Sequence, residues 1–228
     1  MSFQTSLVKS EDFISAMAIA QTLSKNITKT INHTVMPYSI FHIYYESYHT
    51  IWRDVLVCFC LSFVVVTIVN AFLFAFDLRM IIIMTCLTFL MSIVDMGYMH
   101  WTGMNLNPVS LVNLIMLVGI NVEFLSHIGR SYLFSRSTSR LQRAVSAFVE
   151  TGSAVFVGIT LTKVLGIAVL SITKSELFKE YYFKMYMGAI LIAALHGLVA
   201  LPIILSYVGP LNKYTIEEND DLVLFGSE

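Results

Sequence analysis

Four titratable side chains lie inside long apolar stretches of the sequence, where a charge is costly. Glu123 and His127 are four residues apart, and Asp95 and Lys163 lie in two other apolar stretches. Residues four apart share one face of a helix, and a carboxylate beside an imidazole can share and pass a proton near neutral pH. We therefore predict that Glu123 and His127 form a proton relay, with Asp95 and Lys163 as further relay members or as partners in helix pairing.

Two other interpretations of Glu123 and His127 stay open at this stage. The pair could be a mutually satisfied contact between buried helices, without any chemistry. It could also bind a metal ion, but two ligands are too few, and His100 and His196 lie on other stretches with no partner pattern. We therefore expect no metal site and no cofactor. Because no nucleophile–base pair stands out either, we expect no enzyme.

The other polar groups and the glycines of these stretches raise further expectations. Lys163 lies too far inside its stretch to reach water easily, so we expect Glu150 or backbone carbonyls to receive its ammonium group. Asp95 lies late in its stretch, and an interfacial position is the alternative for it. Gly188 and Gly197 in the last stretch indicate close packing between helices.

The composition favours a membrane protein. Of the 228 residues, 57% are apolar and 13% charged, against roughly half and a quarter in soluble domains. The formal net charge of -1 provides no basic field that would hold a nucleic acid. Cys58, Cys60 and Cys86 all lie in apolar runs, so we expect buried hydrophobic side chains there rather than disulfides or zinc ligands.

Five stretches are long and apolar enough to cross a bilayer as helices, which takes about 20 residues each. They are residues 55–76, 80–101, 109–130, 151–173 and 185–207. In the first, only Ser62, Thr67 and Asn70 are polar, so it should insert unaided. The predicted fold class is an all-α membrane protein, with a transmembrane domain of five helices over residues 55–208.

The loop charges predict which ends face the cytosol, because cytoplasmic loops are richer in Lys and Arg. One side carries six such residues, which are Arg79, Arg130, Arg136, Arg140, Arg143 and Lys213. In its two short loops, the other side carries three, which are Lys174, Lys179 and Lys184. Residues 209–228 are therefore expected to be a cytoplasmic tail and residues 1–54 to lie outside the cytosol. Asn26 and Asn32 begin N-glycosylation sequons on that same outer side.

Residues 1–54 are predicted to be the end of a larger lumenal domain of mixed α/β type. Phe13, Met17, Ala20 and Leu23 recur at helical spacing, and the aromatic and β-branched run at 38–45 favours a strand. One helix and one strand are too little to fold alone. No signal peptide follows Met1, so we expect the chain to be the end of a longer protein.

Several strings in the sequence are similar to the last third of the Niemann-Pick type C sterol transporters. They include PYSIF at 37–41, NPVSLVNL at 107–114, GINVEFLSHIGR at 119–130, GITLTK at 158–163 and LSYVGP at 205–210. The resemblance covers about residues 13–210. It implies the second half of a resistance-nodulation-division-type bundle, in which Glu123 and His127 stand at the place of proton-coupling residues.

The resemblance also implies a function and a location. The family moves cholesterol or related sterols between the lumen and the membrane of late endosomes or lysosomes, or takes up dietary sterol at the plasma membrane. A sterol would lie along apolar grooves between helices, since a hydrocarbon ligand needs dry walls more than polar contacts. The implied function is that of the C-terminal membrane part of a proton-coupled sterol transporter.

The family's sterol-binding domain, its sterol-sensing bundle and most of its lumenal domains have no counterpart in these 228 residues. We therefore expect two kinds of partner besides the sterol and the membrane, namely the N-terminal part of the transporter or a full-length copy. No nucleic acid is expected as a partner. Two alternatives stay open: a truncated product with a partner-binding or regulatory role, and a Patched-like lipid exporter or receptor.

Overall fold

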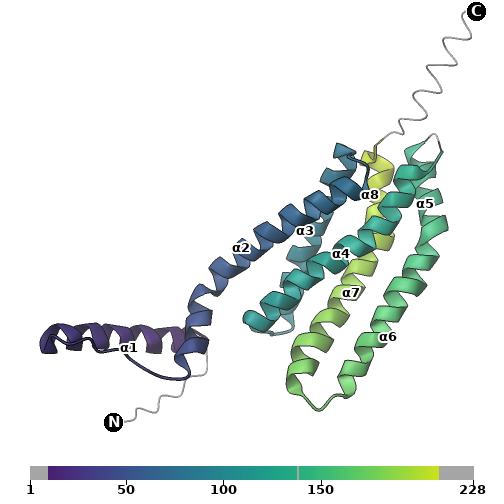
Figure 1. The fold of residues 1–228 in the computed structure, drawn as a ribbon. Coiled ribbons are helices and arrows are strands. Elements are labelled where there is room, and N and C mark those ends of the chain that lie inside the picture. Colours follow the sequence, from purple (N-terminus) through teal and green to yellow (C-terminus); the bar gives the residue numbers. More distant parts are fainter. Residues whose placement is uncertain (1–9, 138, 211–228) are drawn as a thin grey trace, which may run out of the picture. The chain divides into compact units, whose positions relative to one another are not determined.

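The computed structural model describes residues 10–137 and 139–210, and these residues form helices and no strand. The predicted cytoplasmic tail lies outside the described residues from position 211 onward. The chain divides into two compact units. The first comprises residues 1–58 and 106–111, and the second comprises residues 59–105 and 112–228. Figure 1 shows the helices of both.

In the first unit, helix α1 (Ser10–Ile31) confirms the predicted N-terminal helix. The Phe13 ring of α1 stacks on Tyr45 at 4.9 Å between centroids and on Tyr48 at 6.1 Å. At its end, Asn32 takes the left-handed conformation with φ 56°, which is common just after a helix. The chain then turns back, because the Thr28 hydroxyl accepts from the Val35 amide at 3.1 Å.

The predicted strand at residues 38–45 is wrong, because helix α2 (His42–Leu73) already begins within it. A strand needs a neighbour to satisfy its backbone N–H and C=O groups, and the part of the chain that the structure describes offers no other strand. A helix satisfies those groups internally. Its aromatic residues then pack against α1 through Tyr45 and Tyr48. The described part of the α/β segment predicted before the transmembrane helices therefore contains two helical stretches joined by a loop at residues 32–41, and no strand.

Within residues 10–137 and 139–210, the structure confirms five helices long and apolar enough to cross a membrane, at the places predicted. The helices long and apolar enough to cross a membrane are His42–Leu73, Leu78–Trp101, Pro108–Phe134, Arg140–Ile172 and Phe178–Val208. The first three are α2, α3 (Leu78–Trp101) and α4 (Pro108–Phe134). Each observed helix contains most of a predicted stretch and begins between one and thirteen residues before it, since less apolar flanking residues continue the helix.

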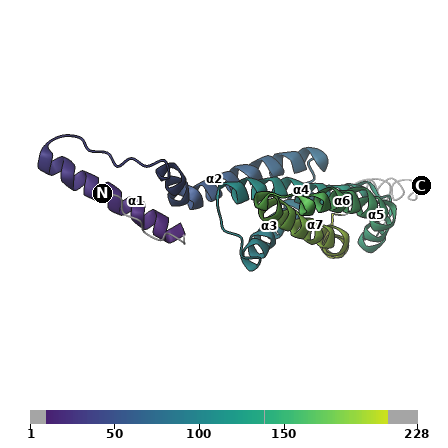
Figure 2. The same cartoon turned by 90° about the horizontal axis from the view of Figure 1, so that it is seen from below.

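The last two membrane helices change their pitch along their length. The fourth consists of α5 (Arg140–Ala154), the π-helical η1 (Val155–Leu161), α6 (Thr162–Ala168) and a 3₁₀ turn η2 (Val169–Ile172). The fifth consists of the π-helical η3 (Phe178–Lys184), α7 (Met185–Leu195), the π-helical η4 (His196–Ala200) and α8 (Leu201–Val208). The two run side by side, with α6 beside α7 in both views (Figure 1 and Figure 2).

Side chains at the helix starts and in the turns explain where the helices begin. Asp77 caps α3 by accepting from the Met80 amide at 3.0 Å. Asn107 and Ser110 cap α4 reciprocally, with each side chain accepting from the other's amide at 2.9 and 2.8 Å. The turn between α2 and α3 places Ala75 and Phe76 at positive φ values of 50° and 60°, which closes the connection within a few residues.

The core of the second unit is apolar and so are its outward faces. Buried side chains include Phe74, Met84, Phe124, Leu125 and Ile190. Many Val, Leu and Ile side chains of the same helices are exposed instead. Helices that are apolar on the outside as well as the inside are typical of membrane spans.

Two glycines of the fifth membrane helix confirm the predicted close packing. A Cβ on Gly188 would lie 2.2 Å from the Tyr98 ring of α3, and one on Gly197 would lie 3.3 Å from the Phe124 carbonyl of α4. The predicted burial of the three cysteines within the protein is wrong. Cys60 and Cys86 are exposed and Cys58 is half-buried, so at least two thiols lie on outward helix faces, where lipid rather than protein would cover them.

Candidate functional site

The Glu123 carboxylate on α4 forms an ion pair with the Lys163 ammonium on α6. The same ammonium lies 5.3 Å from the centroid of the Phe124 ring, a cation–π contact. The side chains of Lys163 and Glu123 are 27% and 43% exposed. Each group thus compensates a charge that would be expensive in hydrocarbon, and together they tie two membrane helices to one another.

The π-helical segment η1 ends at Leu161, two residues before Lys163. Its side chains follow the wider turn, since the Thr160 hydroxyl donates to the Val155 carbonyl five residues back at 3.2 Å. Thr162 donates to the carbonyls of Val157 and Gly158. A π-helical turn holds more residues than an α-helical one, so it changes which face of the fourth membrane helix the residues after it occupy. Such segments are frequent at functional sites.

Glu150 or backbone carbonyls were expected to receive the Lys163 ammonium, and that prediction is wrong, because the ammonium pairs with Glu123. Glu150 accepts a hydrogen bond from the Ser131 hydroxyl at 3.3 Å instead. Lys163 and Glu123 are forty residues apart in the sequence and lie on different helices. The spacing of residues along one helix therefore could not predict that they pair. Only the packing of α4 against the fourth membrane helix shows it.

His127 lies one turn along α4 from Glu123, and its side chain is exposed. It lines an open cavity of about 360 Å³ together with Ser126, Arg130 and Leu73. Among the described residues, the ion pairs join Glu123 to Lys163 and not to His127. The relay role of Glu123 and His127 thus stays a prediction, with Lys163 as the observed partner of the carboxylate.

Asp95 lies deep inside the bundle rather than at an exposed edge, at 2% exposure. Its Oδ2 accepts from the Asn121 amide nitrogen of α4 at 2.8 Å. His196 of η4 acts on Asp95 electrostatically, and the His196 Nδ1 lies 2.8 Å from the Ile192 carbonyl. Asn121, whose side-chain amide joins Asp95 to α4, was missed by the sequence reasoning. It lies only two residues before Glu123.

A second asparagine that the sequence reasoning missed connects α4 to the fifth membrane helix. Asn113 is fully buried and donates to the Tyr181 carbonyl at 2.9 Å. The Tyr186 hydroxyl donates to the Asn113 Oδ1 at 3.4 Å. Buried uncharged amides give a weaker sequence signal than charges in an apolar run, but the requirement that each be hydrogen-bonded points to helix contacts.

Arg143 holds three helices together at the end of the bundle where α4 and α8 finish. It is 1% exposed, and its guanidinium donates to the carbonyls of Pro210 at 2.6 Å, Tyr132 at 3.0 Å and Leu133 at 3.1 Å. It also lies 4.5 Å from the Tyr132 ring centroid. The sequence reasoning counted Arg143 only as a loop charge. In the structure it is buried, and its guanidinium donates hydrogen bonds to backbone carbonyls at helix ends.

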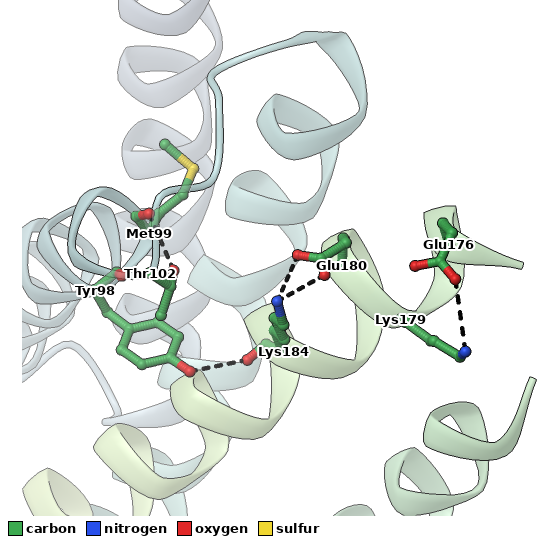
Figure 3. Close-up of polar contacts among 7 residues, drawn as sticks. All are labelled: Tyr98, Met99, Thr102, Glu176, Lys179, Glu180 and Lys184. Atoms are coloured by element: carbon green, nitrogen blue, oxygen red, sulfur yellow. Dashed lines mark hydrogen bonds and ion pairs between the residues drawn. The ribbon is translucent and has the colours of Figure 1, made fainter.

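The opposite end of the bundle carries the contacts shown in Figure 3. The Tyr98 hydroxyl of α3 donates to the Lys184 carbonyl at 3.2 Å. The Lys184 ammonium pairs with Glu180 at 2.6 Å, and Lys179 pairs with Glu176 at 3.6 Å. These lysines are two of the three charges predicted to lie outside the cytosol, and each is neutralised by a nearby glutamate.

The remaining predicted sites lie on the first unit or concern metals. Asn26 and Asn32 are exposed, the former within α1 and the latter just after it. Among residues 10–137 and 139–210, no three His, Cys, Asp or Glu side chains are arranged to hold a metal ion.

The chain is similar to known proteins over most of its length, although no family model matches it. It is 44% identical over 220 residues to the NPC intracellular cholesterol transporter 1 of Sus scrofa, which is 93% of this chain and 17% of that protein. It is 38% identical over 219 residues to the NPC1-like intracellular cholesterol transporter 1 of Homo sapiens, covering 92% of this chain and 16% of that protein. A shorter match, 36% over 129 residues, joins it to the Protein patched homolog 1 of Caenorhabditis elegans, at 57% and 9% coverage.

Proposed function

Since the chain is homologous over nearly its whole length to a segment of the Niemann-Pick type C cholesterol transporters, we propose that it forms part of the membrane domain of a sterol transporter. The observation that carries this proposal is 44% identity over 93% of the chain, joined to five helices able to span a membrane. The chain spans about one sixth of the length of these relatives. The rest of the machinery is therefore supplied by further sequence, on the same polypeptide or on a partner.

The mid-membrane ion pair suggests how proton movement drives the transporter. A proton that binds the Glu123 carboxylate neutralises it and leaves the Lys163 ammonium without its counter-ion. The ammonium is then destabilised in hydrocarbon, so α6 is favoured to change its position relative to α4. His127, which lines the cavity one turn along α4, is placed to hand the proton to Glu123. This arrangement supports the predicted relay of Glu123 and His127 and adds Lys163 to it.

The substrate is a sterol held along apolar helix surfaces. The outward faces of α2, α3 and the fourth membrane helix carry exposed residues such as Leu61, Ile82 and Leu165. A sterol is recognised mainly by dry apolar walls, which such faces provide. The protein acts in the membrane of late endosomes or lysosomes or in the plasma membrane, with residues 1–54 outside the cytosol and the C-terminal tail inside.

A Patched-like lipid exporter or receptor is the second candidate, because the 129-residue match to a Patched homologue favours it. The two candidates share a fold and differ in cargo.

A chimera tests the proposal and separates the candidates. The aligned segment of the Sus scrofa transporter is replaced by this chain, and the chimera is expressed in cells that lack the transporter. Clearance of stored cholesterol, measured by sterol staining, is expected to recover as with the parent. A chimera that reaches the same membranes and clears no cholesterol would overturn the proposal. Activity in the matching Patched chimera alone would favour the second candidate.

A further inference from the structure

The buried pair of Asp95 on α3 and Asn121 on α4 uses only half of its hydrogen-bonding groups. The two side chains are 2% and 0% exposed. One bond joins them, from the Asn121 Nδ2 to the Asp95 Oδ2 at 2.8 Å. A carboxyl group and an amide each carry two polar atoms on one carbon, so groups of these two kinds can form two hydrogen bonds with one another.

The atoms left over are two acceptors. The Asp95 Oδ1 and the Asn121 Oδ1 are both buried and have no hydrogen-bond partner in the described part of the chain. A buried acceptor without a donor is costly, and an ionised carboxylate between membrane helices is more costly still. Adding one proton to the Asp95 Oδ1 would turn this acceptor into a donor, which is what the Asn121 Oδ1 lacks.

We propose that Asp95 is a proton-binding site, in which the protonated carboxyl and the Asn121 amide form a reciprocal pair. The proton comes from water and binds the Asp95 Oδ1. The resulting O–H donates to the Asn121 Oδ1, while the Asn121 Nδ2 continues to donate to the Asp95 Oδ2. On release the proton returns to water, and the carboxylate keeps one bond where the acid had two.

A metal ion fits the two oxygens less well. Hard cations take six or more oxygen ligands, whereas the described residues gather no group of three His, Cys, Asp or Glu side chains. A proton needs only the two oxygens that lack a donor. The chemistry of the donor set thus favours a proton over a cation.

His196 on η4 connects the site to the fifth membrane helix. It is the titratable group of the described residues that acts electrostatically on Asp95. Glu123, two positions after Asn121, pairs with Lys163 instead. The Asp95 site is therefore distinct from the Glu123 site, and it stands whether or not the protein moves a sterol.

Infrared spectroscopy of the purified chain in lipid nanodiscs tests the proposal. A protonated carboxyl group gives a carbonyl stretching band that ionised carboxylates lack. We expect this band in the wild-type chain, its loss on raising the pH, and its loss in Asp95→Asn. The matched control Glu123→Gln should keep the band, and Asn121→Val should shift it, because the acid then loses its amide partner.

A second measurement needs no variant, so it holds even if a substitution prevents folding. A hydrophobic carbodiimide reacts with protonated carboxyl groups in apolar surroundings, and peptide mass spectrometry identifies the labelled residue. Labelling of Asp95 that disappears at high pH supports the site. An unlabelled Asp95, together with a carboxyl band that Asp95→Asn leaves unchanged, would overturn it. Stabilisation by sodium ions with no such band would assign the site to a metal instead and equally overturn it.

Discussion

The ammonium of Lys163 on α6 contacts the carboxylate of Glu123 on α4, and the two residues are forty positions apart in the sequence. Their helices are both long and apolar enough to span a membrane. An opposite pair of charges at this place stabilises the bundle only while both are ionised. Each of the two residues thus compensates the charge of the other, which would be costly alone in hydrocarbon.

The first prediction concerns the coupling between the two charges. Glu123→Gln and Lys163→Gln should each destabilise the protein, because each leaves one charge in hydrocarbon. The double variant should be more stable than the sum of the single effects implies, by roughly 0.5–3 kcal/mol. Thermal unfolding in detergent measures this double-mutant cycle.

The exposed pair of Glu180 and Lys184 is the matched control. Its coupling should be only about 0.3–0.5 kcal/mol, as for other i, i+4 pairs at a surface. Equal couplings for the two pairs would show that Glu123 and Lys163 behave as an ordinary surface contact.

Arg143→Met should destabilise the bundle strongly. The carbonyls of Tyr132, Leu133 and Pro210 lose the guanidinium that donates to all three. The Ser135 amide and the Tyr132 hydroxyl still donate to two of them at 3.4 Å, and one unsatisfied buried acceptor alone costs about 1–3 kcal/mol. Arg143→Lys should recover only part of the lost stability, since an ammonium group lacks the planar set of N–H donors of a guanidinium.

The exposed Arg136 provides the control for this arginine. Arg136→Gln should change the free energy of unfolding by less than about 0.5 kcal/mol. If Arg143→Met unfolds at the same temperature as Arg136→Gln, the capping role is refuted.

Gly209→Ala should destabilise the end of α8. An added Cβ would lie 2.2 Å from the Tyr132 hydroxyl and 2.4 Å from the Leu205 carbonyl. The backbone cannot rotate away easily, because the following Pro210 keeps Gly209 extended. A loss of about 1–3 kcal/mol is expected, as for other overpacked sites. Gly166→Ala on α6, where nothing lies within 4 Å, should be neutral or slightly stabilising in the same unfolding assay.

Glycosylation tests the predicted topology. In chain made by eukaryotic cells, enzymatic removal of N-glycans should increase the mobility, and Asn26→Gln with Asn32→Gln should abolish that change. Arg136→Asn creates a sequon, since Ser137 and Thr138 follow it, and this site should stay unmodified on the cytosolic side. A glycan at position 136 with none at Asn26 or Asn32 would reverse the topology.

The membrane helices were predictable because an apolar run of about 20 residues in a chain such as this has few alternatives to a membrane span. The helical start of α2, where a strand was predicted at 38–45, could not be foreseen. Aromatic and β-branched residues also suit a helix that packs against α1, and their local preference for strands yields to that contact. Glu123 and Lys163 could be identified from the sequence because a charge in an apolar stretch is energetically costly. Their pairing could not be predicted, because it depends on how two helices pack. Asn121 escaped notice because an uncharged amide is cheaper to bury than a charge.

The central claim is that protonation of Glu123, rather than a structural role of its ion pair, drives sterol movement. Cholesterol clearance by the chimera that carries both Glu123→Gln and Lys163→Gln tests this most directly, because the double change leaves no unpaired charge. We predict that this chimera is close to the parent in stability and clears no cholesterol. Clearance at the parental rate by the double variant would contradict the claim.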